Sequence, residues 1–251
     1  MSLEKIKSVG VIGYGRFGKL LASLIKQNYP AVSLSIFSNS NNIDQELFFD
    51  LETVCSSALI IPCVPISNFE ETIKKISEFL HSNQIVMDVC SVKIYPRDIL
   101  LKLVSDRAQI VGSHPMFGPA TYEKRGNSIE GLQVVLDNIN CSAESFAEIE
   151  EFWKNMGLNL VYVEANEHDR LAAKFQFISL CTATMVRSLG LARSSIDTPS
   201  ARAMLNFIEM ISVDESLIRD LYNFNPYCKD EFKKLEGAFD SVRNLLTGQA
   251  G

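Results

Sequence analysis

Hydrophobic and polar residues follow two different patterns along the first two-thirds of the chain. Short apolar runs rich in β-branched residues predict strands buried on both faces, and longer blocks with apolar residues three and four positions apart predict amphipathic helices. The predicted strands are 8–12, 32–37, 58–63, 84–89, 109–112, 132–136 and 159–163. The predicted helices between them are 19–27, 69–80, 96–104 and 143–156. Strands that alternate with helices predict a parallel sheet covered on both faces.

The pattern changes near residue 164, after which no segment resembles a strand. Helical spacing continues at 171–189, 200–211, 215–222 and 227–246. Thr198-Pro199 and Asn225-Pro226 are typical helix starts. We therefore predict an α/β fold: an N-terminal doubly wound parallel sheet over residues 1–164, followed by an all-helical domain over residues 165–251.

Composition narrows the class of protein. The chain has 251 residues, 47% of them hydrophobic and 22% charged, as in ordinary globular proteins. Its net charge of −6 argues against nucleic acid or an anionic membrane as partner. The six cysteines include no C-x-x-C pair, which indicates reduced thiols and no metal site. No apolar run suggests a signal peptide or a membrane span, so we expect a cytoplasmic protein.

A glycine-rich loop, Gly13-Tyr14-Gly15-Arg16-Phe17-Gly18, joins the first predicted strand to the first helix. In this pattern the first glycine permits a tight turn, the second lets backbone N–H groups approach a pyrophosphate, and the third lets the helix pack on the strand. The helix N-terminus then faces the phosphates. We predict a Rossmann-type dinucleotide-binding domain, with these six residues as cofactor contacts.

The end of the second predicted strand indicates which dinucleotide is preferred. It reads Phe37-Ser38-Asn39-Ser40, and no carboxylate follows until Asp44. NAD-binding domains usually carry a carboxylate here for the ribose hydroxyls. The polar side chains of Ser38, Asn39 and Ser40, with Arg16, can instead bind a 2′-phosphate. We predict NADP, with NAD as the alternative, and two further cofactor contacts after the third strand, Val64 and Pro65.

A second motif, Ser113-His114-Pro115-Met116-Phe117-Gly118-Pro119, follows the fifth predicted strand. His114 thus lies at the sheet edge where ligands bind, and histidine titrates near neutral pH. The segment Asp88-Val89-Cys90-Ser91-Val92-Lys93 ends at the same edge. Ser91 can hydrogen-bond an imidazole or a substrate hydroxyl, and Lys93 can hold a carboxylate or a cofactor group. The alternatives are a structural histidine and an ordinary surface serine and lysine.

Together with Glu167-His168-Asp169, these motifs resemble the prephenate/arogenate dehydrogenase family over residues 8–246. The plant-type arogenate dehydrogenases are similar in particular, through Ser-Val-Lys-x-x-Pro-Arg at 91–97 and Gln176-Phe177-Ile178. The resemblance implies NADP-linked oxidative decarboxylation of a cyclohexadienyl substrate in tyrosine biosynthesis. It implies that His114 accepts the ring-hydroxyl proton, that Ser91 orients the histidine or the hydroxyl, and that Lys93 helps to hold cofactor or substrate. The substrate contacts that it implies are Ser113, Gly118, His168, Gln176 and Arg202. It also implies a homodimer through the helical domain.

Two positions depart from the family pattern. Met210 stands where many members have an arginine for the side-chain carboxylate, and Leu180 where a histidine is common. The choice between arogenate and prephenate therefore stays open, and for His168 a helix residue without a role is the alternative. Two other functions are also open: a two-domain hydroxyacid or imine reductase with Lys174 as acid/base, and a non-catalytic NADP-binding sensor.

Overall fold

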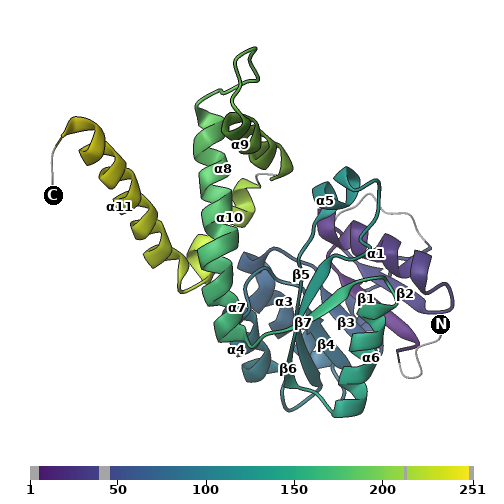
Figure 1. Cartoon of the computed structure of the whole chain (residues 1–251). Coiled ribbons are helices and arrows are strands. Elements are labelled where there is room, and N and C mark those ends of the chain that lie inside the picture. The colour runs from purple at the N-terminus through teal and green to yellow at the C-terminus, as the bar shows by residue number, and fades with distance from the viewer. Residues whose placement is uncertain (1–5, 40–45, 212–213, 249–251) are drawn as a thin grey trace. The chain divides into compact units, whose positions relative to one another are not determined.

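The computed structural model describes residues 6–39, 46–211 and 214–248. The chain divides into two compact units, Met1–Asn166 and Glu167–Gly251. Within the described residues, the first unit holds a seven-stranded sheet of order β2-β1-β3-β4-β5-β6-β7 (Figure 1). The strands are β1 Ser8–Ile12, β2 Ser33–Phe37, β3 Leu59–Pro62, β4 Ile85–Asp88, β5 Gln109–Pro115, β6 Gln133–Asn140 and β7 Asn159–Tyr162. The predicted α/β class is confirmed.

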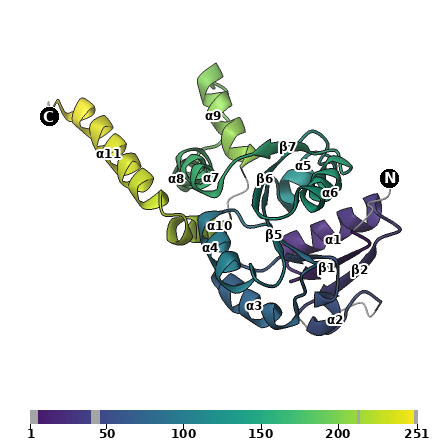
Figure 2. The same ribbon diagram turned by 90° about the horizontal axis from the view of Figure 1, so that it is seen from below.

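Helices cover both faces of this sheet (Figure 2). One face carries α1 Arg16–Asn28 and α6 Ala143–Lys154, and the other carries α2 Leu51–Cys55, α3 Phe69–Ile76 and α4 Ile94–Leu103. Along the chain, a short helix, α5 Pro119–Lys124, connects β5 to β6. Helices α1 and α6 meet where the Tyr29 ring stacks on the Phe152 ring, with 5.3 Å between ring centroids. The Tyr29 hydroxyl also donates to the Phe152 carbonyl.

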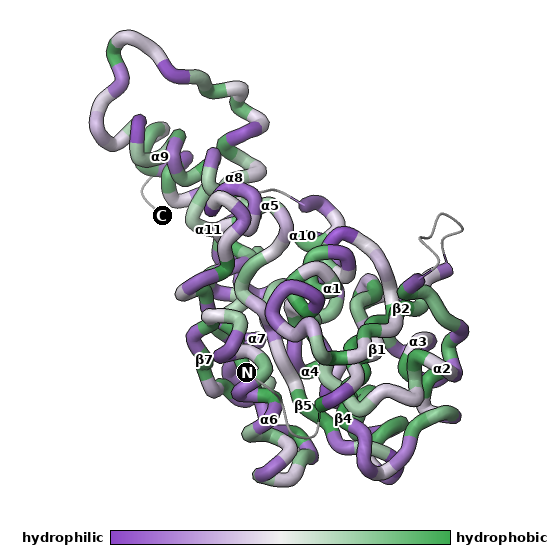
Figure 3. The backbone as a smooth tube through the Cα atoms, turned by 90° about the vertical axis from the view of Figure 1, so that its right-hand side faces the viewer, coloured by the Kyte–Doolittle hydropathy of each residue, from purple (hydrophilic) through white to green (hydrophobic). Residues whose placement is uncertain are grey.

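The sheet is the centre of the hydrophobic core. Every residue of β3 and β4 is buried, as the apolar runs predict for strands covered on both faces. Along the helices hydrophobic and hydrophilic positions alternate, which Figure 3 shows as changes between green and purple. The helices therefore turn an apolar stripe to the sheet and a polar stripe to water.

The sequence pattern predicted a parallel sheet, but one pair of strands in the structure is antiparallel. The pairs from β2 to β5 are parallel, but β5 and β6 are antiparallel. The Met116 N–H donates to the Gln133 carbonyl at 2.9 Å, which closes a wide hairpin between the two strands. The chain thus returns at the edge where β5 ends, and β6 must run in the opposite direction. β7 then pairs parallel to β6.

Strand β5 is longer than predicted. Its predicted end at residue 112 moves to Pro115, so that Ser113 and His114 lie inside the strand. The extra residues pair with Val134, Val135 and Leu136 of β6. Pro115 is tolerated because it is the last residue of the strand.

The second unit is helical over the residues described. Its helices, with α7 beginning just before the division, are α7 Ala165–Ala172, α8 Ile178–Ser188, α9 Pro199–Met210, α10 Glu215–Phe224 and α11 Cys228–Thr247. A π-helical turn, Ala173–Phe177, joins α7 to α8. The Thr198 hydroxyl accepts from the Ala201 N–H at the predicted start of α9. No described helix is long and apolar enough to cross a membrane.

Candidate active site

Four strands end along one edge of the sheet because β1, β3, β4 and β5 run parallel. Ligands of such sheets bind outside this edge, where successive connections leave in opposite directions. Here the reversal falls between β1 and β3, since the chain passes from β1 to β2 on one side and from β3 to β4 on the other. The glycine loop follows β1 and therefore lies at this point.

Two of the three loop glycines have no room for a side chain. Gly13 has a φ of +102°, and a Cβ atom there would lie 2.5 Å from the Cys63 carbonyl oxygen. A Cβ on Gly18 would lie 2.2 Å from the Gly13 carbonyl oxygen. At Gly15, in contrast, an added Cβ has no atom within 4 Å. The fold itself needs Gly13 and Gly18, whereas the space beside Gly15 is open to a ligand.

Helix α1 begins at this loop with features that favour an anion. Gly15 is its N-cap and offers no side-chain cap, and no acidic residue lies in the first turn, which contains Arg16. No carboxylate of the helix's own first turn therefore offsets the partial positive charge of its N-terminus. With the open space beside Gly15, the loop fits the pyrophosphate of a dinucleotide.

The aromatic residues of the loop pack within the first unit. The Tyr14 ring meets Phe48 edge-on, with 5.0 Å between centroids, and the Lys19 ammonium lies 5.5 Å from the Tyr14 ring centre. Phe17 lies 6.3 Å from Phe117, in the segment after β5. Both rings therefore help to hold the loop in place, a role that the sequence pattern did not indicate.

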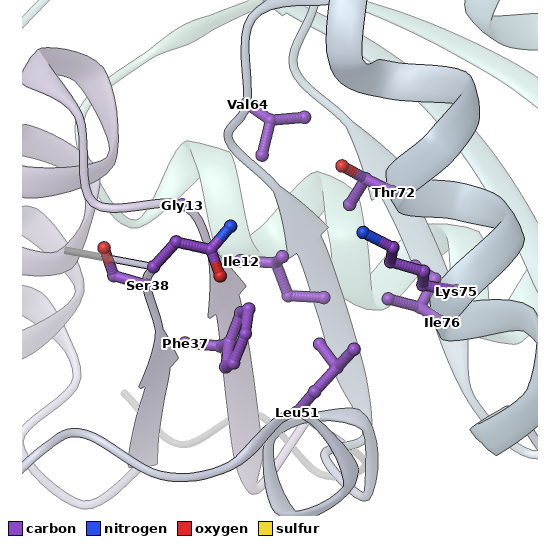
Figure 4. Close-up of a pocket in the computed structure, with 10 residues that line it drawn as sticks. Ile12, Gly13, Phe37, Ser38, Leu51, Val64, Thr72, Lys75 and Ile76 are labelled. Carbon is purple, nitrogen blue, oxygen red and sulfur yellow. The ribbon is translucent and has the colours of Figure 1, made fainter.

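A pocket of about 120 Å³ opens beside the loop at the ends of β1 and β2 (Figure 4). It is lined by Ile12, Gly13, Phe37, Ser38, Asn39, Leu51, Val64, Thr72, Lys75 and Ile76. The structure thus brings the predicted Ser38, Asn39 and Val64 together. Thr72 and Lys75 project into the pocket from α3. The apolar floor and polar rim suit the adenosine half of a dinucleotide.

Two other predicted cofactor contacts do not line this pocket. Pro65 is exposed and precedes a 3₁₀ turn, Ile66–Asn68. Ser40 lies outside the described residues, as does Asp44. Thr72 and Lys75 were missed because helical spacing separates a buried face from an exposed one, without showing which polar residues meet a neighbouring loop.

His114 is the penultimate residue of β5 and is only 3% exposed. Its register partner on β6 is Val135. Ser91 is half-buried in the turn after β4, the strand that pairs with β5 on its other side. The two residues therefore lie at the ends of neighbouring parallel strands. Gly118 is the N-cap of α5, three residues beyond β5.

Lys93 and Ser113 belong to a buried polar cluster between β4 and β5. The Lys93 ammonium donates to the Asp88 carboxylate, and it donates to the Ser113 carbonyl at 2.5 Å. The Ser113 hydroxyl donates to the Asp88 carbonyl at 2.6 Å. The charged side chains are each 1% exposed. Asp88 was missed as a functional residue, although a carboxylate at the end of an apolar strand, five residues before a lysine, was an available signal.

Gly112 makes room for two carboxylates on one face of the sheet. It pairs with Asp88 of β4 on one side and with Asp137 of β6 on the other. A Cβ there would lie 3.5 Å from Asp88 Oδ2 and 3.4 Å from the Asp137 Cβ. Asp137 accepts from the Ala165 N–H at 3.0 Å, at the start of α7, and burial raises the pKa of its carboxyl.

The thiols at this edge are not nucleophiles at neutral pH. Burial raises the pKa of the Cys63 thiol to about 12. Burial and the neighbouring Asp88 carboxylate hold the pKa of Cys90 well above its ordinary value. Because only a thiolate attacks or binds metal, both remain inert thiols. Within the described ranges, no group of three or more His, Cys, Asp or Glu residues could hold a metal ion.

In the second unit, two predicted substrate contacts lie on the helical segment that contains α7 and the π turn. His168 is buried, and its Nδ1 lies 2.8 Å from Asp169 Oδ1. Gln176 lies within the π turn, and its side-chain oxygen is buried without a hydrogen bond among the described residues. π-helical turns are frequent at functional sites, which makes Gln176 the stronger candidate.

The remaining residues of interest in this unit are more exposed. Arg202 is exposed in the first turns of α9, and Met210 is 70% exposed at the end of that helix. Leu180, the other departure, is buried in α8. The Lys174 ammonium lies 5.7 Å from the centre of the neighbouring Phe175 ring.

The fold and the glycine loop define a dinucleotide-binding α/β protein with an appended helical unit. The family described as "Prephenate dehydrogenase, nucleotide-binding domain" matches residues 37–162, half of the chain. The chain therefore belongs to the prephenate dehydrogenase family. The match begins after the glycine loop, so the loop is independent support.

Individual relatives agree with this assignment. Two chloroplastic arogenate dehydrogenases of Arabidopsis thaliana, numbers 2 and 1, are 28% and 27% identical over 96% of the chain. The chain spans 70% of the first relative's length and 39% of the second's. A prephenate dehydrogenase of A. aeolicus, solved with hydroxyphenyl propionate and NAD+, is similar in fold, with a TM-score of 0.73 and 18% identity over 97% of this chain and 91% of that one.

Alanine should destabilise the protein at Gly18 and leave its stability almost unchanged at Gly15. We expect Gly18→Ala to lower the free energy of unfolding by about 3 kcal/mol or more, because the added Cβ meets a backbone carbonyl. Gly15→Ala should leave it within about 0.5 kcal/mol, because the added methyl meets nothing. Urea unfolding of both variants measures the difference. Equal losses would contradict this division of roles.

Proposed function

We propose that this chain catalyses NADP-dependent oxidative decarboxylation of a cyclohexadienyl substrate, arogenate or prephenate, as in tyrosine biosynthesis. The observation that carries the proposal is the place of His114, buried at the end of β5 on the sheet edge that also carries the glycine loop. Membership of the prephenate dehydrogenase family supports the same reaction. So do the printed names of the Arabidopsis relatives.

The chain's own residues account for cofactor binding. The loop from Gly13 to Gly18 would hold the pyrophosphate, and the pocket beside it would hold the adenosine. When bound, NADP supplies a nicotinamide ring that accepts the hydride from the hydroxyl-bearing carbon of the substrate. The described pocket lining contains the Lys75 ammonium, the Ser38 hydroxyl and the Asn39 amide, and no carboxylate, although the Lys75 ammonium pairs with Glu71 outside the lining at 2.7 Å. This lining favours a cofactor with a 2′-phosphate.

His114 would accept the proton of the ring hydroxyl. A histidine base suits neutral pH, and a positioned base contributes about 10²- to 10⁴-fold in rate. Loss of hydride and proton turns the hydroxyl-bearing carbon into a carbonyl. The ring carboxylate then leaves as carbon dioxide, and its electron pair makes the ring aromatic. Ser91 would orient the histidine or the hydroxyl, and Gln176 and His168 would contact the substrate.

The rival functions explain less of the structure. A reductase using Lys174 as acid/base leaves the buried His114 and its neighbours at the sheet edge without a role. A sensor would need the glycine loop and the pocket, but not a histidine at the end of β5. Both rivals predict no turnover of arogenate or prephenate.

The helical unit favours a homodimer. Its described surface includes exposed apolar residues of α8 and α11: Met185, Leu189, Phe239, Val242, Leu245 and Leu246. Between these helices lies a groove of about 430 Å³ lined by Met185, Phe232, Leu235, Glu236, Phe239, Asp240 and Arg243. Apolar surface of this kind usually marks an interface. We propose that a second copy of the chain covers it.

Turnover tests the proposed reaction directly. We expect the purified protein to oxidise arogenate, prephenate or both with NADP, with release of carbon dioxide. His114→Ala should lower kcat by about 10²-fold or more while NADP still binds. His81→Ala, at an exposed turn, is the matched control and should keep turnover. Absence of wild-type turnover on both substrates would refute the proposed reaction, and near-native turnover of His114→Ala would remove His114 from the mechanism.

Cofactor preference is tested by fluorescence titration. We expect a lower Kd for NADP than for NAD. Asn39→Asp places a carboxylate where the 2′-phosphate would lie, and should shift the ratio of the two Kd values toward NAD by about tenfold or more. Asn83→Asp, at an exposed turn away from the pocket lining, should not shift it. Tighter binding of NAD by the wild type would contradict the prediction.

Light scattering tests the dimer. We expect a dimer at micromolar concentration, and a shift toward monomer in Phe239→Asp, which places a charge on the apolar groove. Ser241→Asp adds the same charge at an exposed polar position of α11 and should leave the dimer intact. A monomeric wild type, or equal effects of the two substitutions, would count against this interface.

A further inference from the structure

The buried cluster of Asp88, Lys93 and Ser113 closes the short loop of residues 88–93 at the active-site edge. The ion pair joins the last residue of β4 to the residue just before α4, five positions later. The Cys90 N–H donates to the same carboxylate oxygen, Asp88 Oδ1, at 2.9 Å. Ser91 lies in this loop. Its neighbour Cys90 and, two positions later, Lys93 are both bound by the Asp88 carboxylate, which holds the loop on either side of Ser91.

The Lys93 ammonium also binds this loop to β5. It donates to the carbonyl of Ser113, the residue before His114, and the Ser113 hydroxyl donates back to the Asp88 carbonyl. Side chains alternate along a strand, so His114 leaves β5 on the same face as Gly112. A Cβ on Gly112 would lie 3.5 Å from Asp88 Oδ2, which places the ion pair on that face. One buried charge pair thus fixes both the turn with Ser91 and the strand with His114.

Stability alone does not explain why two charges are buried here. Removing a carboxylate and an ammonium from water costs several kcal/mol each, and apolar replacements of a buried pair are often equally stable. A pair that is held by further hydrogen bonds can instead select one arrangement of the chain. The arrangement selected here is the relative position of the two proposed reactive side chains.

We propose that Lys93 is a positioning residue, whose buried ammonium sets the spacing between Ser91 and His114 without touching cofactor or substrate. This inference rests on the proposed function and replaces the direct contact that the sequence motif implied for Lys93. Its side chain is 1% exposed, and it is occupied by Asp88 and Ser113. A displacement of about 1 Å at a reacting group can cost about 10²-fold in rate, so a small shift of β5 is sufficient.

The test removes both charges together, because a single substitution leaves an unpaired buried charge. In the double variant Asp88→Asn with Lys93→Met, we expect kcat to fall by about 10²-fold while KM for substrate and Kd for NADP stay unchanged. Leu100→Ala, a buried residue of α4 outside the cluster, is the control for lost stability and should keep its turnover. A raised Kd or KM in the double variant, or unchanged kcat, would overturn the proposal.

Histidine NMR separates this proposal from the proposed reaction. The chain has three histidines, so the His114 imidazole signal is assigned by comparison with His114→Gln. We expect the double variant to shift or broaden that signal and to leave those of His81 and His168 in place, whereas Leu100→Ala moves none. If the wild type turns over neither substrate, this shift still supports positioning. If the double variant does not fold, Lys93→Arg, which keeps the charge in a different shape, should shift the same signal and lower kcat with Kd unchanged; no shift would overturn the proposal.

Discussion

Parallel pairing of β1, β3, β4 and β5 is the constraint on which the site depends. It brings the ends of segments more than a hundred positions apart in the chain, from Gly13 to His114, to one edge of one sheet. Each functional group then lies either in the last residues of a strand or in the first residues after it. The glycine loop, the pocket beside it and the histidine can therefore cooperate although no local contact in the sequence links them.

The same edge contains a buried ion pair next to an apolar strand. β4 reads Ile85-Val86-Met87 and then ends in a buried aspartate. The cost of burying that carboxylate is offset by the Lys93 ammonium and by a hydrogen bond from the Cys90 N–H. Gly112, beside it on β5, provides the space. The polar cluster is thus built from two segments, residues 88–93 and residues 112–113, which lie far apart in the sequence and meet where β4 pairs with β5.

The sequence predicted the elements of the fold better than their directions. The first strand, 8–12, has the predicted bounds, because a β-branched run between polar residues and glycine has few other conformations. The direction of β6 could not be predicted, since apolar spacing is the same whichever way a strand runs. The burial of Lys93 could not be predicted, because its partners, Asp88 and the Ser113 carbonyl, become neighbours only in the folded sheet. Likewise Thr72 and Lys75 reach the pocket only through the packing of α3.

The π-helical turn between α7 and α8 has a consequence for the register of the second unit. Such a turn holds one more residue than an α-helical turn, so the side chains beyond it are rotated by about 100° about the helix axis. His168 and Leu180 therefore face in directions that ordinary helical counting does not give. Deletion of one residue from Ala173–Phe177 would restore regular α-helical winding. It would thereby rotate the side chains of α8 about the helix axis relative to those of α7. The length of this stretch, independently of its composition, therefore sets how the side chains of α7 and α8 are oriented relative to one another.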